Sequence, residues 1–220
     1  MPITPQEPDD SASDNRVPYR TSLVNRSHQV VKMGYDLLDP ASLAASEEEV
    51  ITGRLTKAMQ DALEDLEAPL WAKNVWAVEE TRVNDGEREG KHRRRIDIEV
   101  IEQRRGPRPR FRFEAKRLRD SDSRRDYLGH DGLGCFLDGR YAVSDPDAGM
   151  LGYVQEGTEE AHVTAISESL LKDPARFRVA QYGGWKEHPL VRGLQTYTSS
   201  HQRTGVLPGI LIFHTLLNFH

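Results

Sequence analysis

The sequence predicts an α/β protein whose central mixed β-sheet contains a three-stranded antiparallel meander and is flanked by helices. Residues 95–100 and 112–117 alternate apolar and polar side chains with period 2, which is typical of strands that bury one face. Residues 105–109 are rich in Arg, Gly and Pro, so they turn the chain and make these strands antiparallel neighbours. Helix-type patterns before and after them indicate that helices and strands alternate along the chain.

The N-terminal part of the chain predicts a flexible leader followed by a helix. Residues 1–20 are poor in apolar side chains, so we expect a leader there and a single domain over residues 21–220. Ser46 with Glu49 three residues later has the pattern of a capping box and predicts the start of a helix, which Pro69 limits. Its predicted buried stripe consists of Ile51, Leu55, Ala58, Ala62 and Leu66.

The remaining elements follow from periodicity and from Gly-rich breaks. The other strands are predicted near residues 74–83, 149–155, 191–198 and 210–219. A turn is expected at residues 84–86. A helix loosened by glycines is predicted over residues 123–137, and another runs from a Thr158 cap to about Lys172.

Composition narrows the class of protein. Cys135 is the only cysteine of the 220 residues, so no internal disulfide is possible and a reducing, cytoplasmic setting is expected. The longest apolar run, residues 210–219, is too short to span a bilayer, and we expect no membrane partner.

Charge is distributed unevenly along the chain. The net charge is −5, yet residues 88–125 contain 15 of the 30 Lys and Arg residues against 7 Asp and Glu, a local balance of +8. A basic segment within an acidic protein predicts a nucleic-acid partner, although a solvated arginine-rich hairpin has the same composition. The arginines predicted to contact nucleic acid are Arg104, Arg105, Arg108, Arg110, Arg112 and Arg117.

Three polar side chains are expected on one face of the predicted strand pair. They are Asp97, Glu114 and Lys116, and the opposite face carries Ile96, Ile98, Phe113 and Ala115. Carboxylates are the ligands that Mg²⁺ prefers, and the Ala115 backbone carbonyl is a candidate third ligand. Lys116 would orient the attacking water, stabilise the pentacovalent transition state or act as a base. Adjacent carboxylates disfavour the base role because they favour the charged ammonium.

Asp97, followed 17 positions later by Glu114-Ala115-Lys116, resembles the PD-(D/E)XK restriction-endonuclease-like superfamily. The resemblance covers roughly residues 46–155 and departs from the named pattern where Ile96 replaces the proline. It implies a restriction-endonuclease-like core and a Mg²⁺-dependent nuclease, with Mn²⁺ expected to substitute. Asp97 and Glu114 would then bind the metal, and Lys116 would assist the nucleophile.

The resemblance also implies a glutamate from the first core helix at the metal. Glu48 is the best match because Ile51 and Leu55 follow it on the same helix face. Glu47 and Glu49 remain alternatives, Glu49 being better explained as the capping partner.

The sequence therefore predicts a metal-dependent endonuclease that hydrolyses DNA, with RNA as an open alternative. By analogy, we expect the nuclease subunit of a bacterial anti-phage defence or restriction system, acting with a partner subunit or as a homo-oligomer. The competing hypothesis is a catalytically silent module of the same fold that binds nucleic acid or a partner protein. Residues 200–203, Ser-His-Gln-Arg, form either a phosphate-binding or second catalytic element or, more simply, a turn with satisfied side chains.

Overall fold

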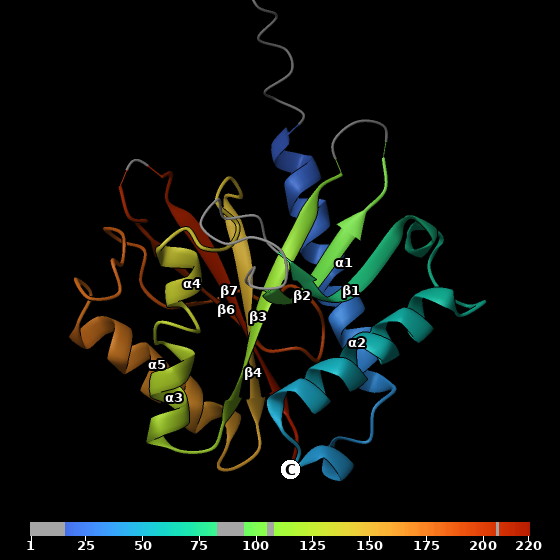
Figure 1. Ribbon diagram of the computed structural model, residues 1–220, viewed down its shortest axis with the longest axis horizontal. Helices are drawn as coiled ribbons and strands as arrows, with labels where there is room; N and C mark the ends of the chain where they lie inside the picture. Colours follow the sequence, from blue (N-terminus) through green and yellow to red (C-terminus); the bar gives the residue numbers. More distant parts are fainter. Residues whose placement is uncertain (1–15, 83–94, 105–107, 206) are drawn as a thin grey trace, which may run out of the picture.

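A seven-stranded mixed sheet forms the centre of the computed structural model, which describes residues 16–82, 95–104, 108–205 and 207–220 (Figure 1). The strand order is β1-β2-β3-β4-β7-β6-β5. β1, β2 and β3 form an antiparallel meander, β3, β4 and β7 are parallel, and β6 and β5 continue antiparallel. The strands are β1 (Val75–Arg82), β2 (Arg95–Glu102), β3 (Arg110–Leu118), β4 (Asp147–Val154), β5 (Lys186–Glu187), β6 (Thr196–His201) and β7 (Ile210–Asn218). The predicted α/β class and the meander are confirmed.

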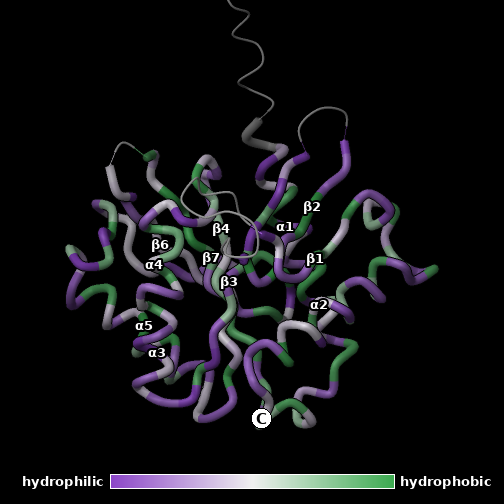
Figure 2. Tube along the Cα trace, in the orientation of Figure 1, coloured by the Kyte–Doolittle hydropathy of each residue, from purple (hydrophilic) through white to green (hydrophobic). Residues whose placement is uncertain are grey.

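Helices cover both faces of the sheet. They are α1 (Arg16–Asp36), α2 (Glu48–Glu64), α3 (Ser121–Tyr127), α4 (Gly134–Leu137) and α5 (Glu159–Lys172), with short 3-10 helices η2 (Pro40–Leu43) and η3 (Leu70–Asn74). α1 and α2 cover one face, and α3, α4 and α5 cover the other (Figure 1). Figure 2 shows hydrophobic and hydrophilic residues mixed along α2 and α5, as expected for helices that bury one side.

Each strand side chain enters one of two cores. Phe113 and Leu151 belong to the core beneath α1 and α2, whereas Met150 and Ile212 belong to the core beneath α3 to α5. This division follows from the alternation of side chains along a strand. One residue departs from the predicted faces: Ile98 packs in the first core with Phe113 and Ala115 as expected, but Ile96 packs in the second core. The neighbouring strand β1 is distorted at this level, at Glu80, which has a φ of 50°.

The beginning of the domain differs from its prediction. Residues 16–20, expected in the leader, form the first turn and a half of α1, and residues 1–15 lie outside the described part of the chain. α1 was not predicted because polar residues interrupt its buried side. Ser27 and His28 are fully buried, and their side chains hydrogen-bond the carbonyls of Leu23 and Val24 one turn earlier, at 2.8 Å each.

The predicted capping box of α2 is wrong. The helix starts at Glu48 with Glu47 as its N-cap residue and without a side-chain cap bond, while Glu49 is exposed. Gln155, which follows β4, donates to the carbonyls of Leu43 and Ser46 at 3.2 and 2.8 Å. This contact fixes the chain before the helix. The predicted stripe is buried except for Leu66, which lies beyond the last turn and is fully exposed.

The glycine-rich region predicted as one helix forms α3 and α4. Asp120 caps α3 through a reciprocal bond with Ser123, and Thr158 caps α5 as predicted by accepting from the Ala161 amide at 3.2 Å. A Cβ at Gly132 would lie 2.2 Å from the Tyr127 carbonyl oxygen, so only glycine allows the tight link between the helices. The strand predicted near residues 191–198 forms only from Thr196 onward. The turn predicted at residues 84–86 lies outside the described residues. In the described part, no helix is long and apolar enough to cross a membrane.

Candidate active site

β2 and β3 separate at the position of Asp97. The paired residues of these strands run from Ile101 and Arg110 to Ile98 and Phe113. Beyond that point, the Asp97 carboxylate accepts a hydrogen bond from the Ala115 amide, with Oδ2 and N 2.7 Å apart. Where the two strands diverge, the Asp97 side chain thus takes the place of a β2 backbone carbonyl as acceptor for the Ala115 amide. This bond fixes the Asp97 carboxylate next to β3.

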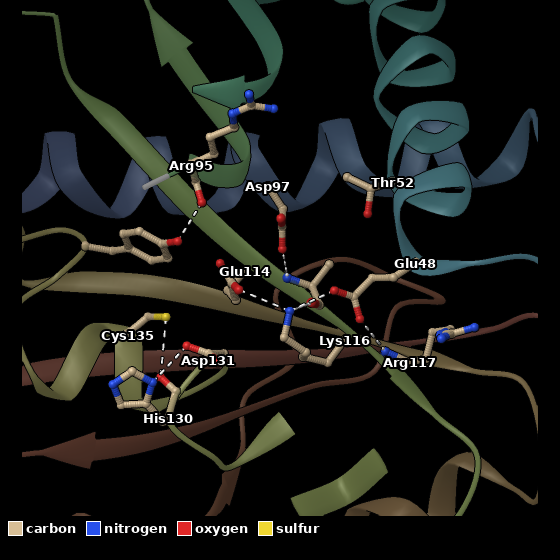
Figure 3. A network of polar contacts seen from close by, with 12 residues as sticks. Glu48, Thr52, Arg95, Asp97, Glu114, Lys116, Arg117, His130, Asp131 and Cys135 are labelled. Atoms are coloured by element: carbon tan, nitrogen blue, oxygen red, sulfur yellow. Dashed lines mark hydrogen bonds and ion pairs between the residues drawn. The ribbon is translucent and has the colours of Figure 1, made fainter. Parts of the chain in front are cut away.

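Lys116 lies at the centre of the site, between α2 and the side chains of β3 (Figure 3). Its Nζ donates to Glu48 Oε1 at 2.7 Å, to the Ala115 carbonyl at 2.7 Å and to Glu114 Oε1 at 3.1 Å. Glu48 Oε2 accepts from the Arg117 amide at 3.2 Å. The first turn of α2 is therefore bonded directly to β3.

A second contact positions the same end of α2. The Thr52 hydroxyl, one turn after Glu48, lies 3.0 Å from the Tyr153 hydroxyl of β4, and both groups are buried. α2 is thereby connected to two neighbouring strands, so the Glu48 carboxylate is held by packing as well as by its own bonds.

Burial and mutual repulsion shift the ionisation of the carboxylates. Burial raises the pKa of Asp97 to about 6, and nearby Glu48 and Glu49 add to this effect, while Lys116 and the Ala115 amide oppose it. Burial, followed by the charge of Asp97, raises the pKa of Glu114 well above its ordinary range. Two carboxyl groups with raised pKa values are typical of sites that bind a cation or transfer a proton.

Lys116 keeps its charge in this environment. Burial alone would lower the pKa of the Lys116 ammonium, but the charges of Glu114, Glu48 and Asp97 raise it above its ordinary value. The ammonium is therefore a fixed positive charge, and the base role considered from the sequence is disfavoured.

The four predicted catalytic residues lie together. Of the three candidate glutamates, Glu48 is the one that contacts Lys116, whereas Glu47 pairs with Arg117 at 2.7 Å and Glu49 is exposed. The sequence did not identify Tyr141 as part of this region. Its hydroxyl donates to the Arg95 carbonyl at 2.6 Å, and burial, followed by the charge of Glu114, raises its pKa. Tyr141 lies in a loop without periodicity, so only the fold reveals it.

The predicted nucleic-acid-binding arginines are largely occupied by contacts within the protein. Glu99 accepts from Arg112 at 3.0 Å and lies 3.5 Å from Arg110, while Asp145 accepts from Arg112 at 2.5 Å. Arg117 pairs with Glu47, as described above. Of the others, Arg104 lies 4.2 Å above the Tyr19 ring, Arg108 is exposed and Arg105 is outside the described residues.

Residues 200–203 form a satisfied structural element. His201 is buried, with Nε2 2.6 Å from the Ser199 hydroxyl and Nδ1 2.7 Å from the Phe177 carbonyl. Arg203 is also buried, and it donates to the carbonyls of Pro208, Ala142 and Asp145 at 2.6 to 2.8 Å. The simpler of the two sequence-based interpretations accounts for these contacts.

The donors at the site fit a hard divalent cation. Glu114 Oε2 is buried and has no hydrogen-bond partner in the described structure, and Asp97, Glu48 and the Ala115 carbonyl supply further oxygens. Oxygen ligands of this kind suit Mg²⁺. No three His, Cys, Asp or Glu side chains of the described residues form a ready-made metal-binding group. The ammonium of Lys116 separates Glu48 from Glu114, so a shared cation would require it to move aside.

Comparison of the chain with protein-family models, with curated proteins and with solved structures finds no match.

Because the pKa of Asp97 is raised, replacing its carboxyl group by an amide should stabilise the folded protein at high pH but not at low pH. Because the folded state binds this proton more tightly than the unfolded chain, ionisation of Asp97 lowers stability as the pH rises from about 4 through 6. Without metal, Asp97→Asn is expected to stabilise the protein by about 1–2 kcal/mol near pH 8, after a discount for solvent screening. The gain should disappear near pH 4. Thermal unfolding at several pH values measures it.

The exposed residue Asp126 provides the matched control. Asp126→Asn should change stability by less than about 0.5 kcal/mol at every pH. A gain for Asp97→Asn that is equal at pH 4 and pH 8 would contradict the assigned cause.

Proposed function

We propose that this protein is a Mg²⁺-dependent nuclease with a restriction-endonuclease-like core, and that it hydrolyses phosphodiester bonds in DNA. The observation that carries the proposal is the convergence of Glu48, Asp97 and Glu114 on the Lys116 ammonium and the Ala115 backbone. These residues come from α2, β2 and β3, and they meet where β2 and β3 separate.

The residues of the site divide into those that would hold a cation and one that carries a permanent positive charge. Asp97, Glu114, Glu48 and the Ala115 carbonyl would hold Mg²⁺ or Mn²⁺. When bound, such an ion neutralises phosphoryl oxygens and lowers the pKa of a water molecule. Lys116 would orient the attacking water and stabilise the negative charge that develops on the phosphoryl oxygens. The ammonium now bonds both Glu48 and Glu114, so it would leave its place between them when the cation binds.

The wider setting of the proposal comes from the resemblance and the composition. We propose that the protein is cytoplasmic, because its buried free thiol Cys135 suits a reducing compartment. By the resemblance, we propose that it belongs to a bacterial defence or restriction system. Cleavage of both DNA strands requires two sites, so a second copy or a partner subunit is part of the proposal.

One observation favours the silent module as a second candidate. Lys116 bonds both Glu48 and Glu114, so the ammonium neutralises carboxylates that a metal would otherwise share. In a binding module this arrangement would be a stable buried ion cluster, and nucleic acid would bind without cleavage.

Incubation of the purified protein with DNA distinguishes the two candidates. Supercoiled plasmid and a single-stranded oligonucleotide are incubated with Mg²⁺, with Mn²⁺ or with EDTA, and the products are separated by electrophoresis. We expect cleavage only with a divalent ion, because the carboxylates alone provide no activated water. Tight DNA binding without cleavage under every condition, including addition of proteins encoded by neighbouring genes, would support the silent module instead.

A further inference from the structure

A basic cleft lies between α3 and α5, outside the predicted arginine-rich hairpin. It has a volume of about 600 Å³. Four cations line it against two carboxylates, although the whole chain has a net charge of −5. The cations are Arg124, Arg125, Lys172 and Arg176, and the carboxylates are Glu168 and Asp173.

In the part of the chain that the structure describes, three of the four cations that line the cleft lack the ion pairs that Arg110 and Arg112 form in the hairpin. Within the described residues, Arg124, Lys172 and Arg176 have no ion-pair partner, whereas Arg110 and Arg112 are paired with carboxylates. An unpaired cation can bind an external anion without first breaking an internal bond. These three cations of the cleft are therefore available to an external anion, whereas Arg110 and Arg112 of the hairpin are held by internal carboxylates.

Arg124 is held toward this cleft by a buried histidine. Its guanidinium nitrogen Nη1 lies 3.4 Å from His162 Nδ1, and His162 Nε2 lies 2.8 Å from the Glu156 carbonyl. Since Nε2 carries the proton that this carbonyl accepts, Nδ1 is the acceptor for Arg124. Burial lowers the pKa of His162, which keeps the ring neutral and suited to accept.

The cleft lies close to the candidate active site along the chain. Ser121, which lines the cleft, follows Lys116 by five residues, and these residues span at most about 18 Å. α3 follows directly from β3, and α3 and α5 cover the sheet face toward which Glu114 points, because Phe113 and Ala115 enter the opposite core (Figure 1). At 3.4 Å per nucleotide step, this upper bound corresponds to at most about five nucleotides of a duplex strand.

We infer that the cleft between α3 and α5 binds the phosphodiester backbone of the nucleic-acid substrate a few nucleotides from the bond to be cleaved. The inference rests on the proposed nuclease function. Arg124, Lys172 and Arg176 contact phosphate oxygens, and these contacts carry no base specificity. The cleft positions the strand, and the cluster around Lys116 performs the chemistry.

Binding of labelled oligonucleotides in EDTA tests this inference without cleavage. The cleft variant combines Arg124→Gln, Lys172→Gln and Arg176→Gln. The control combines Arg54→Gln, Lys186→Gln and Arg192→Gln, which removes the same charge from exposed positions on other elements. Near 0.1 M salt, we expect the cleft variant to bind duplex DNA about 10- to 100-fold more weakly than the control. Its slope of log affinity against log salt should be smaller by about 2 to 3.

Parallel measurements with duplex DNA, single-stranded DNA and RNA identify the nucleic acid whose backbone the cleft binds. A charge-preserving variant, Arg124→Lys with Lys172→Arg and Arg176→Lys, should retain most of the affinity. It thereby separates loss of charge from loss of folding, which thermal unfolding of each variant also checks. Equal weakening in the cleft and control variants, or no binding by the wild type, would overturn the inference.

The outcome is distinguishable from that of the proposed function. Metal-dependent cleavage by the wild type together with unchanged affinity of the cleft variant would support the nuclease function and overturn the proposed role of the cleft. Weaker binding by the cleft variant together with an inert wild type would support the cleft as a nucleic-acid-binding surface and overturn the proposed nuclease function.

Discussion

Asp97→Asn and Glu114→Gln are each expected to lower the rate of metal-dependent DNA cleavage by about 10³-fold or more. Each substitution removes one negative charge from the oxygens that would hold the cation, while the shape of the side chain is kept. Because both carboxyl groups are buried and the charge of Asp97 adds to the raised pKa of Glu114, removal of one charge relieves an unfavourable term in the folded state. Activity should therefore fall while stability is retained or increased, which initial rates and thermal unfolding measure together.

Lys116→Ala separates charge at the reacting phosphate from metal binding. It removes the ammonium that bonds Glu48, Glu114 and the Ala115 carbonyl. Cleavage should fall by about 10² to 10³-fold because the developing negative charge is no longer stabilised. The uncompensated carboxylates should also destabilise the protein by about 3 kcal/mol without metal, and a divalent ion should restore part of this loss.

Lys57→Ala provides the matched control, because Lys57 forms an exposed pair with Asp61 on α2. It should leave cleavage unchanged and alter stability by less than about 1 kcal/mol. Full cleavage by Asp97→Asn or by Lys116→Ala would contradict the proposed site.

The sequence predicted the residues of the site better than it predicted the first helix. Period-2 alternation locates β2 and β3, and a polar residue on such a strand has only two directions in which to point. Alternation therefore accounts for Glu114 and Lys116. Asp97, whose neighbours Ile96 and Ile98 lie in opposite cores, is instead brought to them by its bond to the Ala115 amide. α1 could not be found in this way, because its buried side includes His28, and the hydrogen bond to the Val24 carbonyl that allows this burial is invisible in the sequence.

The arginines show a different limit of sequence reasoning. A count of charges finds the excess over residues 88–125, but it does not show which cations are already paired. Glu99 and Asp145 are 46 residues apart, yet both contact Arg112. Arg124 lies at the end of the same basic segment, and α3 turns it toward α5, where no carboxylate of the described residues pairs with it. Only the tertiary structure shows that Arg112 is paired with carboxylates and that Arg124, among the described residues, is not.

Gly34→Ala is expected to reduce both stability and cleavage, because α1 and α2 cross in close contact at this residue. A Cβ at Gly34 would lie 2.7 Å from the backbone nitrogen of Met59 and 2.9 Å from its Cα. The backbone of α2 cannot yield as a flexible side chain could, so the helices must separate. Destabilisation of about 2–3 kcal/mol should follow despite the better helix propensity of alanine. This loss lowers the unfolding midpoint by about 4–12 °C.

The same displacement should reach the candidate active site. Glu48 begins the helix that contains Met59, so a shift of α2 moves its carboxylate away from Lys116. A shift of about 1 Å in a positioning group is sufficient to lower a rate by about 10²-fold. Gly53→Ala tests the opposite case in α2 itself, since its Cβ would meet only the exposed carboxylate of Glu79 at 3.2 Å.

Gly53→Ala should therefore stabilise the protein by up to about 1 kcal/mol and leave cleavage unchanged. Equal effects of these two substitutions would show that helix propensity, rather than the α1–α2 contact, determines the outcome. Opposite effects, with cleavage falling only for Gly34→Ala, would show that the packing of α1 against α2 sets the position of Glu48. α1 would then belong to the catalytic architecture although it supplies no residue to the site.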